Sequence, residues 1–325
     1  MTFPKTRLRR LRYNPLLRDL VSQTKISVND LIYPLFVCEG ENVKNNISSM
    51  PGQFQLSIDN LLLECKKAIS KGIKGVLLFG IPNKKDNDGQ SACSDSSIVQ
   101  RAIRAIRKEN LNILIIADVC NCEYTHHGHC GTIIDGDVDN DLTLKTLSNQ
   151  SVSLAKAGAD IIAPSDMMDG RVSSIRTALD NSGHEKTPIL SYSVKYSSAF
   201  YGPFRNAANS SPKDFDRKTY QMNYCNSDEA LREVEQDLNE GADMIMIKPA
   251  LSYLDIIYKV KQYTNVPVVA YSVSGEYAMI KAASEKNWLD ETAIMIETIS
   301  SIKRAGADII ITYYAMEIAD FLNRK

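Results

Sequence analysis

Ala157-Gly158-Ala159-Asp160-Ile161-Ile162 is the stretch that decides the fold, because it recurs twice more along the chain. The copies are Glu240-Gly241-Ala242-Asp243-Met244-Ile245 and Ala305-Gly306-Ala307-Asp308-Ile309-Ile310. Each copy closes an amphipathic segment and opens an apolar run. A glycine at this place accepts the left-handed backbone that often ends a helix, and a continuous apolar run is typical of a parallel strand covered on both faces. The repeated phrase therefore predicts the turn between a helix and a parallel strand.

Eight apolar runs of this kind occur in the chain, and helical patterns lie between most of them. The predicted strands are Leu31–Phe36, Gly75–Phe79, Asn112–Asp118, Asp160–Ser165, Pro188–Tyr196, Met244–Lys248, Pro267–Ser274 and Asp308–Tyr313. This alternation predicts an α/β fold, a TIM (β/α)8 barrel. A doubly wound open sheet is the competing architecture, but no glycine-rich dinucleotide fingerprint follows any strand. We expect an N-terminal arm over residues 1–24 and a barrel domain over residues 25–325.

The composition excludes several classes of protein. Hydrophobic residues make up 44% of the 325 residues, as is usual for a globular protein. Lys plus Arg (38) nearly balances Asp plus Glu (39), so the net charge gives no reason to expect nucleic acid or a membrane as a partner. The apolar runs are too short to cross a bilayer, and no signal-peptide core precedes the barrel. We therefore expect a cytoplasmic protein whose seven cysteines are reduced.

The first 24 residues carry six basic side chains before the first acidic one, Asp19. A transit peptide would have this composition, and contact with nucleic acid or a membrane is a further possibility. The interpretation we favour is an extended arm that packs on a neighbouring subunit, because the basic run is short and leucines accompany it. These leucines are Leu8, Leu11, Leu16, Leu17 and Leu20.

Lys195 and Lys248 each close an apolar predicted strand. A buried ammonium is costly, so either lysine alone could be snorkelling or salt-bridged. The carboxyl ends of the strands meet at one end of a TIM barrel, where two lysines would disfavour each other's charge. At least one amine would then be neutral and nucleophilic near pH 7, ready to form a Schiff base with a ketone or aldehyde.

Cys120, Cys122 and Cys130 follow the predicted strand that ends at Asp118, in a segment that also contains three of the four histidines. Clustered thiolates are typical ligands of zinc, and three protein ligands would leave the open position of a catalytic site. A closed structural site with a histidine as fourth ligand is the alternative, as are incidental thiols.

A long polar segment, residues 197–226, separates one predicted strand from its helix and suggests a lid or binding loop. Its Arg205 and Arg217 could clamp a carboxylate through paired hydrogen bonds. Ser274 and Tyr313 follow the last two predicted strands, where hydroxyls could hold a second carboxylate. Taken singly, each of these residues is equally compatible with a structural role.

Seven segments along the chain together resemble the delta-aminolevulinic acid dehydratase (porphobilinogen synthase) family, and the resemblance extends to the basic arm. The segments are Asp118–Gly131, Ala163–Arg171, Ser191–Lys195, Phe200–Arg205, Met246–Pro249, Val273–Glu276 and Ile311–Tyr314. The resemblance implies a lyase that condenses two molecules of 5-aminolevulinate to porphobilinogen, with loss of two waters, for haem and other tetrapyrroles. Lys248 would form a Schiff base with the first substrate and Lys195 with the second, and Asp118 would lie near the ring-closing chemistry.

The resemblance also implies a set of substrate-binding residues. Ser274 and Tyr313 match positions that hold the carboxylate of the first substrate, while Ser165 and Tyr192 line the same pocket. Three further residues match positions that hold the carboxylate of the second substrate: Arg205, Arg217 and Gln221. Small departures occur at Asn206, Asn209 and His126, where family members often carry other residues.

The resemblance implies cofactors and an assembly as well. Cys120, Cys122 and Cys130 match the zinc-binding version of the family motif, and Glu233 aligns with a glutamate that holds an allosteric magnesium in some members. Family members assemble as homo-octamers through the N-terminal arm. The competing hypotheses are another Schiff-base barrel, such as a class I aldolase, which needs neither paired lysines nor zinc, and an inactive zinc-storing barrel.

Overall fold

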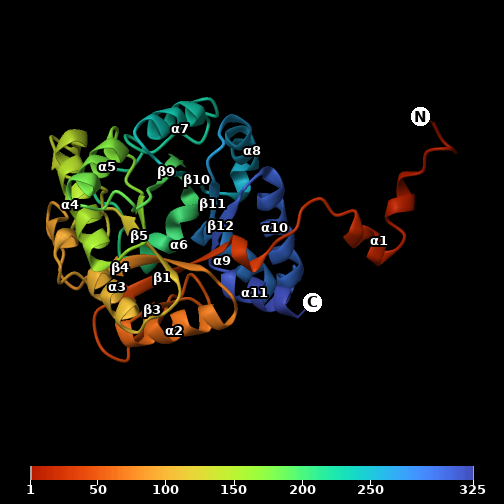
Figure 1. Ribbon diagram of the computed structural model, residues 1–325, viewed down its shortest axis with the longest axis horizontal. Coiled ribbons are helices and arrows are strands. Elements are labelled where there is room, and N and C mark those ends of the chain that lie inside the picture. The colour runs from red at the N-terminus through yellow and green to blue at the C-terminus, as the bar shows by residue number, and fades with distance from the viewer. Residues whose placement is uncertain (1, 325) are drawn as a thin grey trace.

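Eight parallel strands form a closed ring at the centre of the molecule (Figure 1), in a computed structural model that describes residues 2–324. Their order is β8-β5-β4-β1-β12-β11-β10-β9, and a parallel bridge between Ile162 and Ile189 joins β8 to β9. The strands are β1 (Leu31–Cys38), β4 (Gly75–Ile81), β5 (Leu114–Val119), β8 (Ile161–Pro164), β9 (Leu190–Lys195), β10 (Met244–Lys248), β11 (Val268–Ser272) and β12 (Ile309–Thr312). The predicted TIM barrel is confirmed.

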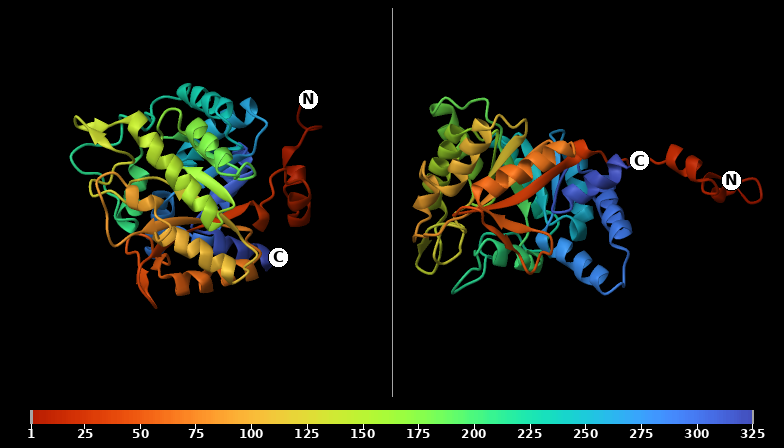
Figure 2. Two further views of the ribbon diagram at one scale, coloured as in Figure 1. Left: turned by 60° about the vertical axis from the view of Figure 1, so that its left-hand side comes forward. Right: turned by 90° about the horizontal axis from the view of Figure 1, so that it is seen from below.

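Helices surround the ring of strands, except for the short α6, which lies at one end of the barrel (Figures 1 and 2). They are α2 (Ile58–Ser70), α3 (Ile98–Lys108), α4 (Asn140–Ala157), α5 (Arg171–Asn181), α6 (Gly202–Ala207), α7 (Glu229–Asn239), α8 (Leu254–Tyr263), α9 (Ser274–Glu285), α10 (Glu291–Ala305) and α11 (Ala315–Asn323). Every residue of β1, β4 and β9 is buried, as expected for strands with helices on one side and the barrel interior on the other. Among residues 2–324, none of the helices combines the length and apolarity that a membrane crossing requires.

The repeated glycine–aspartate phrase has two separate structural roles. Gly158, Gly241 and Gly306 have φ values of 108°, 104° and 123°, which is the backbone conformation expected where a helix ends. The aspartate that follows reaches the neighbouring strand: Asp308 accepts a hydrogen bond from the Val268 amide (2.8 Å) at the start of β11. In the same way, Asp160 accepts a hydrogen bond from the Ile115 amide in β5. Asp243 accepts one from the amide of Ile189, the residue before β9. These bonds fasten neighbouring strands at their amino ends.

The structure adds short elements that the sequence patterns did not predict. β2 (Lys44–Asn46) pairs with β3 (Phe54–Leu56), and β3 also pairs with β1. A small hairpin of β6 (Ile133–Ile134) and β7 (Asp137–Val138) follows the cysteine cluster. The segment 197–226, predicted as a long polar loop, contains α6, so the expectation of a loop throughout is wrong.

The N-terminal residues extend away from the barrel beyond α10 and α11 (Figures 1 and 2). They contain a short 3-10 helix, η1 (Leu8–Leu11), and α1 (Pro15–Leu20), in neither of which any residue is buried. Leu8, Leu16 and Leu20 are each more than 70% exposed. Apolar side chains this exposed lack a partner within the described part of the chain.

Candidate active site

The polar residues predicted at the strand ends lie together at the carboxyl end of the barrel. Asp118 is in β5, Ser165 follows β8, and Lys195 and Lys248 close β9 and β10. All four residues are buried, and three of them are ionisable, which is unusual because charged side chains are seldom buried in proteins. This end of a TIM barrel is where catalytic residues of this fold are found.

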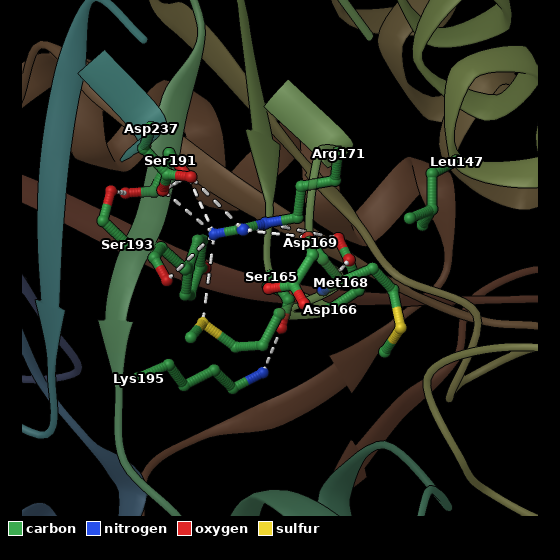
Figure 3. A network of polar contacts seen from close by, with 12 residues as sticks. Leu147, Ser165, Asp166, Met168, Asp169, Arg171, Ser191, Ser193, Lys195 and Asp237 are labelled. Carbon is green, nitrogen blue, oxygen red and sulfur yellow. Dashed lines mark hydrogen bonds and ion pairs between the residues drawn. The ribbon is translucent and has the colours of Figure 1, made fainter. Parts of the chain in front are cut away.

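The two lysines are direct neighbours across adjacent strands. Lys248 of β10 is the register partner of Lys195 of β9. Both ammonium nitrogens lie over the ring of Tyr192, with Nζ 5.1 Å from the ring centre for Lys248 and 5.7 Å for Lys195. Lys195 Nζ donates a hydrogen bond to the carbonyl oxygen of Ser165 (Figure 3). The lysines therefore belong to one site.

Lys248 is enclosed by aromatic rings and has no hydrogen bond from Nζ to a described residue. Its Nζ lies 4.4 Å from the ring centre of Tyr271, 5.2 Å from that of Phe204 and 5.3 Å from that of Tyr201. Burial and, to a smaller extent, the neighbouring Lys195 lower the pKa of Lys248 to about 7. A lysine with this pKa is partly uncharged at neutral pH and can act as a nucleophile.

Asp118 faces both lysines. Burial and the neighbouring Glu123 raise its pKa to about 7, while Lys248 and Lys195 act in the opposite direction. Its Oδ2 accepts a hydrogen bond from Ser165 Oγ (3.0 Å), whereas its buried Oδ1 has no partner among the described residues. A carboxyl group with this pKa and a free oxygen can accept or donate a proton.

The three cysteines converge in the loop that follows β5. The sulfur atoms of Cys120, Cys122 and Cys130 lie within 4.8 Å of one another, and all three residues are buried. His129 points elsewhere: its ring nitrogens contact Tyr220 Oη (3.0 Å) and the Lys213 carbonyl oxygen (2.9 Å). The three thiols could therefore hold a metal ion without a histidine, and thiolates are typical ligands of zinc.

Three residues from the segment 197–226 bring unused hydrogen-bonding groups to the site. Arg217 is buried, and its Nη2 donates to the carbonyl oxygens of Gly128 and Ser210 (2.7 Å each). Its Nε, the Nε of Arg205 and both amide atoms of Gln221 are buried with no partner among residues 2–324. Unpaired buried donors are costly, so this arrangement suits a ligand that accepts hydrogen bonds, such as a carboxylate.

The two predicted hydroxyl residues are both buried, and Ser274 contacts the segment that contains α6. Ser274 Oγ donates to the Phe200 carbonyl oxygen (3.2 Å) and accepts a hydrogen bond from the Phe204 amide (3.0 Å). Tyr313 Oη contacts Tyr271 Oη (3.0 Å). Tyr192 Oη, which faces the same site, has no partner within the described chain.

Glu233 is the one predicted site residue that lies away from the lysines. It stands on α7, outside the barrel, where it lines a surface cavity together with Asp169 and Glu229. Burial raises its pKa to about 7. The remaining predicted residues all lie at the carboxyl end of the barrel or in the segment that covers it.

Sequence reasoning found Tyr192 but missed the other aromatic residues around Lys248, as well as Glu123. Tyr201 and Phe204 lie in Phe200–Arg205, one of the segments that carry the family resemblance. Only the folding of α6 and the residues just before it over the end of the barrel brings both rings close to the Lys248 amine. Tyr271 lies on β11, and its position beside β10 follows from strand register, which no single segment reveals.

Comparison with known proteins places these features in a family. A model of the family described as "Delta-aminolevulinic acid dehydratase" matches residues 5–321. The chain is 53% identical to the delta-aminolevulinic acid dehydratase of Halalkalibacterium halodurans over 319 residues, which are 98% of this chain and 97% of that protein. It is also 53% identical to that of Synechocystis over 324 residues, which are 98% of this chain and 99% of that protein.

A solved structure gives the same result. The crystal structure of delta-aminolevulinic acid dehydratase (porphobilinogen synthase) from Toxoplasma gondii, in complex with the reaction product porphobilinogen, superimposes with a TM-score of 0.95 at 46% identity. The match covers 97% of this chain and 91% of that one.

Proposed function

This chain belongs to the delta-aminolevulinic acid dehydratase family, the lyases that form porphobilinogen, and from that premise we propose how its residues carry out the reaction. Lys248 forms a Schiff base with the ketone of the first 5-aminolevulinate, and Lys195 forms one with the second. The observation that carries this proposal is the register pairing of two buried lysines on adjacent strands. A class I aldolase-like reaction would need only one of them.

The two lysines account for the atoms lost in the reaction. Each neutral amine attacks a ketone carbon, and the ketone oxygen leaves as water when the imine forms. Both lysine nitrogens are released when the new carbon–carbon and carbon–nitrogen bonds replace the imines, so two waters are lost and the enzyme is regenerated. Asp118 is the group in reach of both lysines that can move the protons at ring closure.

The substrate carboxylates bind at two separate places. Ser274 and Tyr313 offer hydroxyls to the first, beside Lys248. The second meets the unpaired donors of Arg205, Arg217 and Gln221, whose buried and unused hydrogen-bonding atoms support this role. Ser165 and Tyr192 line the site between the two lysines.

Cys120, Cys122 and Cys130 would hold a catalytic zinc, and their convergence within 4.8 Å supports this ligand set. When bound, zinc supplies Lewis-acid chemistry to the amino or carbonyl group of the second substrate. Reduced thiols suit a cytoplasmic enzyme. An allosteric magnesium would be held at Glu233, where carboxylates line a surface cavity.

We also propose that residues 1–24 form an arm, separate from the barrel of residues 25–325, through which subunits assemble into a homo-octamer. The exposed leucines of η1 and α1 support this role, because they would be buried against a neighbouring subunit.

The proposal is tested by incubating the protein with 5-aminolevulinate and measuring porphobilinogen with a pyrrole colour reaction, before and after chelation and zinc return. Cys122→Ser is expected to lose both bound zinc and product, while Cys225→Ser, at an exposed cysteine outside the cluster, should retain both. Circular dichroism should show that the barrel survives chelation. Full zinc binding by the Cys122→Ser variant would contradict the ligand set, and unfolding on chelation would make the zinc structural.

A further inference from the structure

Glu276 is a fully buried carboxylate in the first turn of α9, and it belongs to none of the groups assigned above. Its two oxygens accept three backbone hydrogen bonds. Oε1 accepts from the amides of Ala250 (3.0 Å) and Leu251 (2.8 Å), and Oε2 accepts from the amide of Val273 (3.1 Å). Several amide hydrogen bonds to one side chain make a directional tie, and these bonds oppose the burial that raises the pKa of Glu276 to about 7.

The bonds of Glu276 connect the two residues expected to bind the first substrate. Ala250 lies two residues after Lys248, and Val273 lies immediately before Ser274. One side chain therefore ties the chain that leaves β10 to the chain that leaves β11, just where the Schiff-base lysine and the carboxylate-binding serine stand. Since all three donors are backbone amides, the connection constrains the path of the main chain at both residues.

β10 and β11 are also paired in the sheet, up to Ile247 and Ala270, but the other hydrogen bonds at Lys248 and Ser274 themselves lead to different segments. The Lys248 carbonyl oxygen accepts hydrogen bonds from the Tyr196 amide and Tyr201 Oη (3.0 Å each), which come from the end of β9 and from η4 (Ala199–Tyr201). Ser274 Oγ forms hydrogen bonds with the backbone of Phe200 in η4 and Phe204 in α6. These contacts lie in the segment 197–226, whereas Glu276 links the segments that leave β10 and β11.

We propose that Glu276 is a positioning residue that sets the separation between Lys248 Nζ and Ser274 Oγ, and so selects keto acids in which the ketone and carboxylate have the spacing of 5-aminolevulinate. The inference rests on the proposed roles of Lys248 and Ser274. Simultaneous capture of both ends of one substrate depends on this separation, and a displacement of about 1 Å in a reacting group can cost about a hundredfold in rate.

The test compares two ketones that differ in the carboxylate. Borohydride traps the imine at Lys248, and peptide mass mapping locates it. The first probe is 4-oxopentanoate, which has the ketone and carboxylate of the substrate but no amine, and the second is butanone, which has no carboxylate. The ratio of their trapping rates measures how much the carboxylate contact helps the lysine. Glu276→Gln should lower this ratio about 10- to 100-fold, while the butanone rate keeps its wild-type value.

Asp308→Asn is the matched control, because it removes a carboxylate from an amide at the opposite end of β11. It should destabilise the barrel without changing the ratio. Glu276→Asp keeps the carboxyl group but shortens the side chain by one methylene, so it should also lower the ratio of trapping rates. It replaces Glu276→Gln if that variant does not fold. A folded Glu276 variant with the wild-type ratio would overturn the inference. A wild-type protein that forms no adduct at Lys248 with either probe would instead overturn the proposed function.

Discussion

At the scale of single residues, reactivity depends on keeping a lysine amine uncharged near neutral pH. Lys248 achieves this through burial among aromatic rings and through its neighbour Lys195, both of which disfavour the ammonium. Asp118 opposes them, so the amine is poised rather than permanently neutral. Each of these influences can be tested separately.

Lys248→Ala should lower porphobilinogen formation by more than about 10³-fold, the scale seen when a covalent nucleophile is removed. Borohydride should then trap no 4-oxopentanoate at position 248. Lys66→Ala is the control, because Lys66 is exposed and paired with Glu109 on the surface. Near-normal turnover in Lys248→Ala would refute the covalent mechanism.

The rate of imine trapping at Lys248 should rise with pH through about 7 and level off above it. The sign follows from the lowered pKa of about 7: below it the nitrogen carries a proton and cannot attack, and above it the amine is free. Trapping rates of 4-oxopentanoate between about pH 5.5 and pH 9 would show the midpoint. A rate still rising steeply at pH 9 would mean that the lysine titrates near its ordinary pKa.

At the scale of elements, a buried arginine connects β9, which carries Lys195, with the loop after β8, which accepts a hydrogen bond from Lys195 (Figure 3). Arg171, at the start of α5, donates from Nη2 to Asp237 of α7 (3.1 Å) and to Ser191 of β9 (3.0 Å), and from Nη1 to the Met168 carbonyl oxygen (3.1 Å). It therefore joins β9, α7 and the loop after β8, whose Ser165 accepts the hydrogen bond of Lys195.

Arg171→Met should reduce the free energy of unfolding by about 3–5 kcal/mol, because it leaves the buried Asp237 carboxylate without its partner. Urea denaturation measures the loss. Arg101→Met removes a surface pair with Glu39 and should cost only about 0–1 kcal/mol. Equal losses in the two variants would show that burial adds nothing to the Arg171 contacts.

The success of sequence reasoning also differed between elements. The barrel strands could be predicted because each is a continuous apolar run, three of them after the repeated glycine turn, and the lysine pair because both lysines close such runs. α6 was missed because a six-residue helix that begins with Gly202-Pro203 has the composition of a turn. The contacts of Asp308 and Glu276 with other strands could not be predicted, because they depend on register between distant segments.

At the scale of the whole molecule, the N-terminal arm is the part that the barrel leaves uncovered. Removal of residues 1–12 deletes η1 and most of the basic side chains, together with Leu8 and Leu11. The shortened protein should have a lower mass in solution, measured by light scattering, while its circular dichroism stays that of the barrel. An unchanged mass would count against the arm as the means of assembly.

The aspartates of the repeated phrase form hydrogen bonds between neighbouring strands at one rim of the barrel, and the residues that we propose to react lie at the other. Substitutions at that second rim, by natural variation or laboratory evolution, therefore leave these hydrogen bonds unchanged. Such a division gives the scaffold tolerance: new side chains for other keto acids can be tried there while the opposite rim keeps the cylinder closed.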